Sequence, residues 1–251
     1  MIKLILQISC FFTLTFSALH SDESLKSLQP YFLPSEMEIK GKLDALFKKS
    51  RHLLNSKTLK EAGFTDNKPR KYTQVIVTKH PEFEGFVFKI YLDAQRYKSD
   101  ELEEVTFLNR IQGAAAIREY IEENGLQEMF KVPKKWLYPI VQGPKAKKEF
   151  AAKKYILVAE DMHLLDSKGN RDAWKSEKIT KELLANLYQI LKVVGLSDCA
   201  KIENIPFSED GKVAFIDTES YGEKSVPFKR LKKSLNPKAQ VIWDELIKNK
   251  N

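Results

Sequence analysis

Hydrophobic periodicity predicts a chain that mixes strands with helices. Alternating or continuous apolar residues predict strands over residues 73–78, 86–92, 135–140 and 155–159. Apolar residues three and four positions apart predict helices over 36–54, 99–124, 180–194 and 237–248. Gly195 is a natural stop for the third helix, and Gly113 is a candidate break in the second. Residues 168–174 fit neither pattern and are expected to form a loop.

The first 21 residues have the pattern of a secretory signal peptide. Lys3 precedes an apolar run that ends near the small residues Ser17 and Ala18. We therefore expect an exported protein, secreted or held in a periplasm or secretory lumen. The run is short for a bilayer span, but an uncleaved anchor, and with it a membrane partner, stays open. Because Cys10 lies in this leader, the mature chain keeps Cys199 and no internal disulfide is expected.

Composition and charge narrow the class of partner. A chain of 251 residues with 43% hydrophobic content can bury one good core or two small lobes. The net charge of +8 favours an anionic partner, although a solvated lysine surface is the alternative. Nucleic acid is not expected, because the lysine clusters stand apart from the aromatic strands. The chain has neither a Gly-x-Ser-x-Gly motif nor paired zinc ligands.

One lysine is embedded in a predicted strand. Alternation over 86–92 puts Lys89 on the same strand face as Val87 and Tyr91, opposite Phe86 and Phe88. If that face is buried, the lysine needs an anionic partner. An edge-strand lysine facing water is the alternative.

A predicted hairpin carries oxygen ligands at one end. Asp210-Gly211 between apolar runs marks a tight turn. Asn204 stands at the entrance of this hairpin and Asp217 at its exit, with Asp198 just upstream. Amide and carboxylate oxygens suit Mg²⁺, which takes one or two protein oxygens and completes its shell with phosphates and water.

This arrangement resembles the protein-kinase-like superfamily, especially the aminoglycoside and choline phosphotransferases, in which an Asp, an Asn, a strand pair and a metal-binding Asp follow one another. The separation of Asn204 from Asp217, 217 − 204 = 13, matches that pattern. The resemblance implies a two-lobed α+β fold over residues 68–251, with an N-lobe at about 68–159 and a C-lobe at about 160–251. Residues 22–67 then form an N-terminal helical extension, expected to pack on this domain.

The same resemblance implies an ATP site. Lys89 would hold the nucleotide phosphates and pair with a glutamate of the following helix. Several acids of residues 99–124 are available, and the place of Glu119 before the next strand favours it. Backbone groups around Glu160 would hold the adenine, with Met162 against the ring.

In the resemblance, Asp217 and Asn204 hold Mg²⁺ and Asp198 is the catalytic base that accepts a hydroxyl proton. The function that the resemblance implies is phosphate transfer from ATP to a small-molecule or protein hydroxyl, and the alternative is a pseudokinase that binds without turnover. Asp198 stands six residues before Asn204, where the family has five, and Ser197 replaces the usual His. These departures leave nucleotide binding in place and put transfer in question.

Overall fold

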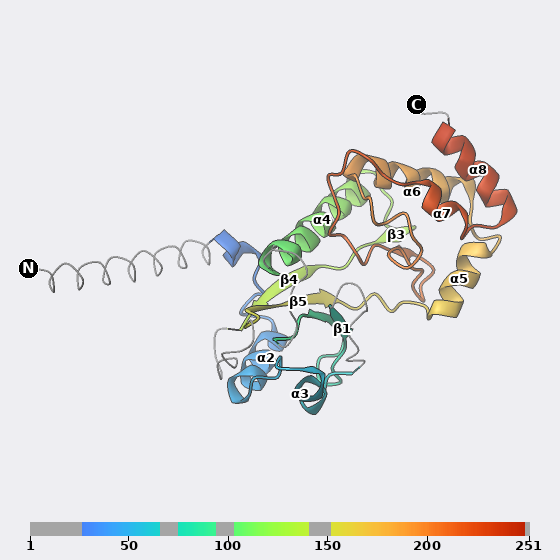
Figure 1. Cartoon of the computed structure of the whole chain (residues 1–251). Helices are drawn as coiled ribbons and strands as arrows, with labels where there is room; N and C mark the ends of the chain where they lie inside the picture. Colours follow the sequence, from blue (N-terminus) through green and yellow to red (C-terminus); the bar gives the residue numbers. More distant parts are fainter. Residues whose placement is uncertain (1–26, 66–74, 94–102, 141–151, 249–251) are drawn as a thin grey trace, which may run out of the picture.

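The computed structural model describes residues 27–65, 75–93, 103–140 and 152–248, so the leader and its processing lie outside the described part. The described chain is an α+β protein (Figure 1). Its helices are η1 (Gln29–Tyr31), α2 (Glu38–Lys49), α3 (Ser56–Glu61), α4 (Glu103–Glu123), α5 (Ser167–Lys175), α6 (Lys181–Val194), α7 (Lys229–Lys232) and α8 (Pro237–Lys248). Its strands are β1 (Ile76–Thr78), β2 (Phe86–Ile90), β3 (Phe130–Lys131), β4 (Lys135–Pro139), β5 (Tyr155–Glu160) and β6 (Val213–Ala214).

Four of the strands form an antiparallel sheet in the order β1-β2-β5-β4. β5 is central, and its register pairs Phe88 with Val158 and Lys89 with Leu157. Successive side chains of a strand point to opposite faces, so the two sheet faces have different cores. The four predicted strands are confirmed, three of them with shorter bounds, since β1 begins at Ile76, β2 ends at Ile90 and β4 ends at Pro139. Lys89 lies on the face opposite Phe88, as alternation predicts.

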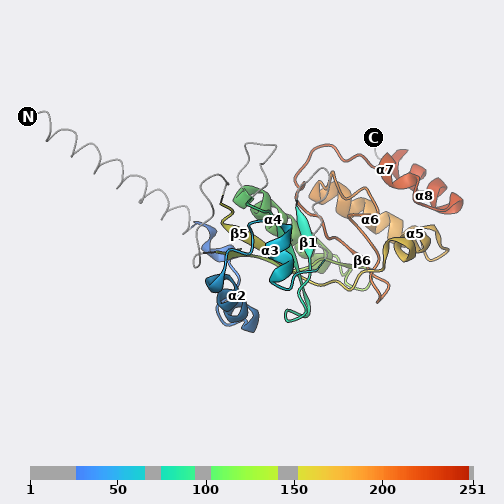
Figure 2. The same cartoon turned by 60° about the horizontal axis from the view of Figure 1, so that its bottom comes forward.

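The N-terminal extension packs on one sheet face, as the sequence predicts. Buried side chains of α2 and α3 share a core with Phe88 and Val158, and both helices lie on the same side of the sheet in two views (Figures 1 and 2). The single helix predicted over 36–54 is wrong in its last five residues, 50–54. α2 ends at Lys49, and α3 begins after Asn55, whose side chain caps the backbone N–H groups of Lys57 and Thr58.

The long helix α4 covers the other sheet face and continues beyond it. Phe107 and Ile111 pack against Leu137 and Leu157 of the sheet, whereas the second half of α4 joins the helical core and packs against α6. α4 is one continuous helix, so Gly113 does not divide it. This helix ties the sheet to the helical region (Figure 1).

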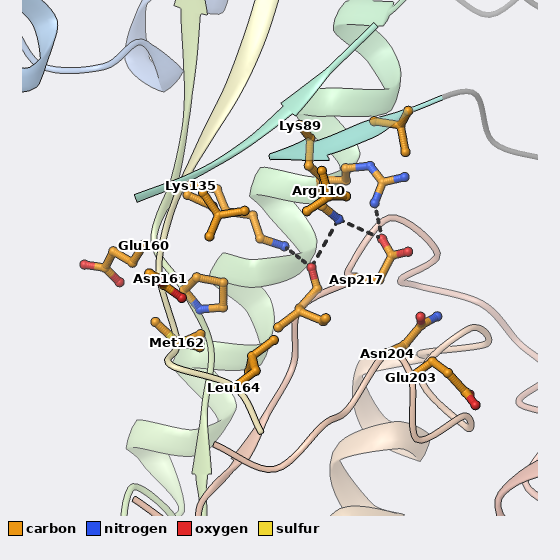
Figure 3. A pocket seen from close by; sticks show the side chains of 16 residues that line it. Lys89, Arg110, Lys135, Glu160, Asp161, Met162, Leu164, Glu203, Asn204 and Asp217 are labelled. Carbon is orange, nitrogen blue, oxygen red and sulfur yellow. Dashed lines mark hydrogen bonds and ion pairs between the residues drawn. The ribbon is translucent and has the colours of Figure 1, made fainter. Parts of the chain in front are cut away.

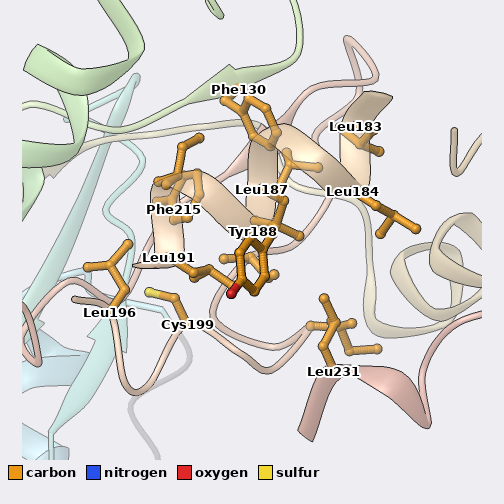
Figure 4. Close-up of a cluster of buried hydrophobic side chains, with 14 of the residues drawn as sticks. Phe130, Leu183, Leu184, Leu187, Tyr188, Leu191, Leu196, Cys199, Phe215 and Leu231 are labelled. Carbon is orange, nitrogen blue, oxygen red and sulfur yellow. The ribbon is translucent and has the colours of Figure 1, made fainter. Parts of the chain in front are cut away.

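The C-terminal half is built around α6 and its apolar face (Figure 4). Thr180 caps the first turn of α6, and Gly195, in the left-handed conformation at φ +70°, ends it as predicted. The loop predicted over 168–174 is wrong, because these residues lie within α5. The side chain of Asp166 caps that helix, and α5 buries Trp174 completely.

No helix of the described residues is both long enough and apolar enough to cross a membrane.

Candidate functional site

A cleft lies where the sheet face that carries Lys89 meets α4 and the hairpin after α6 (Figure 3). One wall is apolar, because strand side chains meet residues of the segment after β5 and of the hairpin. Its apolar lining includes Val77, Val87, Ala159, Met162, Leu164 and Ile216. The other end of the cleft is lined by charged and amide side chains. Such a pocket suits a ligand with a flat apolar part joined to a charged part.

Five of the residues predicted for the site line this one cleft: Lys89, Glu160, Met162, Asn204 and Asp217. Lys89 and Asp217 are 128 positions apart in sequence, yet the Lys89 Nζ lies 3.5 Å from the Asp217 Oδ1. The strand lysine is thus mostly buried and faces a carboxylate, which decides against the edge-strand alternative.

The predicted hairpin forms and places two of these residues. Its turn uses Gly211 at φ +82°, and the Ile216 N–H donates to the Asn204 carbonyl oxygen at 3.1 Å. Asn204 and Asp217 therefore stand on adjacent chain segments at the same end of the hairpin (Figure 3). β6, in this hairpin, also pairs in parallel with β3, which fixes the hairpin to the chain after α4.

Arg110 is the charged side chain that α4 brings to the cleft. It is 4% exposed and forms ion pairs with two carboxylates, through Nη1 to Asp217 and through Nη2 to Glu219. A buried guanidinium held by two carboxylates is a fixed structural feature, because removing either partner would leave charge uncompensated. Asp217 therefore faces a protein cation (Figure 3).

Two lysines complete the charged end. Lys89 Nζ donates to the Ile216 carbonyl oxygen at 3.3 Å, and Lys135 Nζ donates to the same oxygen at 3.2 Å. Lys135 also donates to the Thr218 Oγ1 at 2.7 Å and is 5% exposed. Three cations from three elements thus converge on the short segment around Asp217.

This convergence lowers two pKa values, each for a different reason. Burial alone would raise the pKa of the Asp217 carboxyl, but the charges of Lys89, Arg110 and Lys135 outweigh it and hold that pKa well below its usual range. Burial, reinforced by the charges of Lys89 and Arg110, lowers the pKa of Lys135 well below that of a free lysine. The three basic side chains therefore stabilise the Asp217 carboxylate, and their mutual repulsion disfavours the charged form of Lys135.

The backbone after β5 is only partly available for a purine ring. The Glu160 N–H donates to the Lys134 carbonyl oxygen at 3.0 Å, and the Asp161 N–H donates to that of Gly85 at 2.8 Å. Among the described residues the Met162 N–H has no hydrogen-bond partner. The predicted segment thus lies at the cleft, and the N–H groups of Glu160 and Asp161 are already used within the protein.

Two predicted site residues lie outside the lining. Glu119 is exposed on α4, nine residues beyond Arg110, or about 13.5 Å along the helix axis. Asp198 forms ion pairs with Lys201 at 2.8 Å and with Arg230 at 3.9 Å. Its backbone carbonyl accepts a hydrogen bond from the Asn204 side-chain amide at 2.9 Å, so it adjoins the cleft through Asn204.

Arg110 and Lys135 are the site residues that the sequence reasoning missed. A signal for Arg110 exists: it falls between Phe107 and Ala114 on the buried face of α4, and a charge at such a position needs a partner. Lys135 opens a predicted strand, as Lys89 lies within one, but its pattern does not distinguish it from a surface lysine.

Comparison with known families and with curated proteins finds no matching family model and no matching protein. The functional conclusion therefore has to come from the chemistry of the cleft.

Proposed function

We propose that this protein binds an adenine nucleotide in the cleft and that it is a kinase-like pseudokinase, an exported binding module without turnover. The observation that carries the proposal is the apolar wall set beside three convergent cations. An adenine ring would lie between aliphatic side chains such as Val87 and Ile216, with the Met162 N–H at its edge. The phosphates would then lie toward Lys89, Arg110 and Lys135.

The order of elements supports the kinase-like part of the proposal. The lysine strand β2 is followed by helix α4, by β4, and by β5, which leads into the segment at Glu160. Helix α6 then leads into the chain that carries Asn204 and Asp217. Each predicted feature therefore occurs in the order that a kinase-like nucleotide site requires.

In the described arrangement, the residues do not fit a divalent metal on Asp217. Asn204 and Asp217 supply suitable oxygens, but the Asp217 carboxylate is ion-paired with Arg110, and the Lys89 ammonium stands 3.5 Å away. Cations at these positions repel a divalent ion and stabilise the carboxylate in its place. The Mg²⁺ predicted at Asn204 and Asp217 stays a prediction, and it belongs to the second candidate function.

That second candidate is ATP- and Mg²⁺-dependent phosphate transfer. It is favoured by the position of Asn204 and Asp217 in one cleft, and by the hydrogen bond that joins Asn204 to Asp198. For transfer, Arg110 would have to leave Asp217, and Asp198 would have to exchange its two basic neighbours for an acceptor hydroxyl.

A matched pair of lysine variants tests nucleotide binding. ATP binding by the full chain is measured by isothermal titration calorimetry, once in EDTA and once in excess Mg²⁺. Lys89→Met should weaken binding about tenfold or more, because the phosphates lose a charge-assisted hydrogen bond. Lys131→Met is the control, since Lys131 also lies in a strand but pairs with Asp210 outside the cleft.

Three results decide between the candidates. Failure of ATP to bind in either buffer would overturn the proposed function. Binding without release or transfer of phosphate, over a broad panel of hydroxyl acceptors, is the result expected of a pseudokinase. Turnover in Mg²⁺ that Asp217→Asn abolishes would replace it by the phosphotransferase.

A further inference from the structure

Three basic side chains surround the Asp217 carboxylate at the charged end of the cleft. Lys89 and Arg110 pair with Asp217, Arg110 also pairs with Glu219, and Lys135 donates to the neighbouring Ile216 carbonyl and Thr218 hydroxyl oxygens. We propose that this protein holds its nucleotide through these three cations and needs no divalent metal to do so. The inference rests on the proposed function, and it specifies the metal-free nucleotide as the ligand.

The position of Arg110 carries the first step. Its side chain is 5% exposed and is fixed from two sides, by Asp217 and by Glu219. A metal ion on Asp217 would have to displace the guanidinium and leave it buried beside a double positive charge. Desolvation makes such an unpaired charge costly, so the resident ion pair excludes the metal.

The second step is that Arg110 and Lys135 can each donate a further hydrogen bond to an anion. Arg110 Nε is buried and has no hydrogen-bond partner among the described residues. Lys135 donates to a carbonyl and a hydroxyl oxygen, which are neutral acceptors, and forms no ion pair within 4.0 Å among the described residues. Phosphate oxygens accept charge-assisted hydrogen bonds from guanidinium and ammonium groups. The protein therefore supplies the positive charge that a metal supplies elsewhere.

The metal dependence of ATP binding to the wild-type full chain is the primary test. The expected result is an affinity in EDTA equal to that in excess Mg²⁺, or up to about tenfold higher, because complexed ATP carries less negative charge toward the three cations. A tenfold or greater loss of affinity in EDTA would overturn the inference while leaving nucleotide binding intact. No binding in either buffer would remove the proposed function itself, and the inference with it.

A variant of Arg110 gives a readout that a structural role would not produce. Arg110→Gln should lower the affinity in EDTA about tenfold or more, and it should make binding depend on Mg²⁺ because Asp217 is released from its ion pair. Arg110→Lys keeps the positive charge, and its affinity for ATP should be the same in EDTA and in Mg²⁺. Arg118→Gln is the control, since Arg118 lies eight residues further along α4 and donates to the Pro133 carbonyl.

Thermal melting of each variant shows whether it folds. If Arg110→Gln does not fold, the comparison of the wild-type affinity for ATP in EDTA and in Mg²⁺ still tests whether binding needs a metal. Retention of full EDTA affinity by a folded Arg110→Gln would contradict the assignment of Arg110 to the phosphate site.

Discussion

The packing of α4 against the cleft depends on a glycine, and replacing it gives a sharp prediction. A Cβ added to Gly113 would overlap the carbonyl oxygen of Thr218, and it would approach Tyr221 Cδ1 to 3.1 Å. The obstacle is mainly backbone, and the Thr218 hydroxyl ties this segment to the Arg110 carbonyl at 2.5 Å. Gly113→Ala must therefore push α4 away from the segment that carries Asp217.

The magnitude follows from two opposing effects. Alanine is favoured over glycine in a helix interior by about 1 kcal/mol. Overpacking a well-packed interior costs about 1–3 kcal/mol, and the upper end applies where backbone must move. We expect Gly113→Ala to lower the free energy of unfolding by about 1–2 kcal/mol. Because the displaced segment carries Asp217, which pairs with Lys89 and Arg110, Gly113→Ala should also weaken ATP binding.

A matched control lies in α2. Gly41 also occupies a helix interior, but a Cβ there meets no heavy atom within 4 Å. Gly41→Ala should therefore raise the free energy of unfolding by about 0.5–1 kcal/mol. Urea denaturation followed by tryptophan fluorescence measures both variants by linear extrapolation. Equal stabilisation by the two substitutions would refute the close approach of α4 to Thr218.

Three further predictions concern buried polar groups. Asp93 is fully buried and accepts hydrogen bonds at 2.8 Å from two nitrogens of Arg51. Asp93→Ala should therefore lower the free energy of unfolding by about 3–5 kcal/mol, because it leaves the Arg51 charge without its partner. A loss below about 1 kcal/mol in urea denaturation would contradict this. Burial raises the pKa of the Cys199 thiol to about 12, so iodoacetamide at pH 8 should label Cys199 only after denaturation. Peptide mapping distinguishes labelled Cys199 from labelled Cys10. Rapid labelling of Cys199 in the native protein would contradict its burial. The lowered pKa of Asp217 contributes stability above the unfolded value near 3.9 that is lost as the pH falls through the folded pKa. The stability difference between wild type and Asp217→Asn should thus be constant above about pH 5 and shrink below about pH 4, whereas a difference independent of pH would refute the ion pairing.

Local patterns predicted the main elements because their causes are local. Strand alternation acts over two residues and helical periodicity over three or four, and both are visible in the sequence. The short helices α3 and α5 were missed because their stability depends on caps at Asn55 and Asp166 and on tertiary burial of side chains such as Trp174. The α+β class is confirmed, and the finer kinase-like arrangement stays a proposal.

The cleft was predictable to the extent that its residues belong to one strand or one hairpin. Lys89 follows from alternation, and Asn204 with Asp217 follows from the turn at Asp210-Gly211. Arg110 and Lys135 could not be placed in the same way. Arg110 is 107 positions from the carboxylate it pairs with, and Lys135 is 81 positions from the carbonyl it contacts, so only the folded chain brings them together.

The sign of the charged side chain that α4 places beside Asp217 determines whether the hairpin can bind a cation or an anion. The spacing of Asn204 and Asp217 is the same whether the helix presents a glutamate or an arginine, so spacing alone cannot distinguish a metal site from an anion site. A glutamate paired with Lys89 would leave Asp217 free to bind a cation. Arg110 instead pairs with Asp217 itself, and the Lys89 and Lys135 ammonium groups lie beside the same short segment. The motif therefore predicts where the cleft residues lie, whereas the charge around Asp217 is set by Arg110, a helix residue outside the motif.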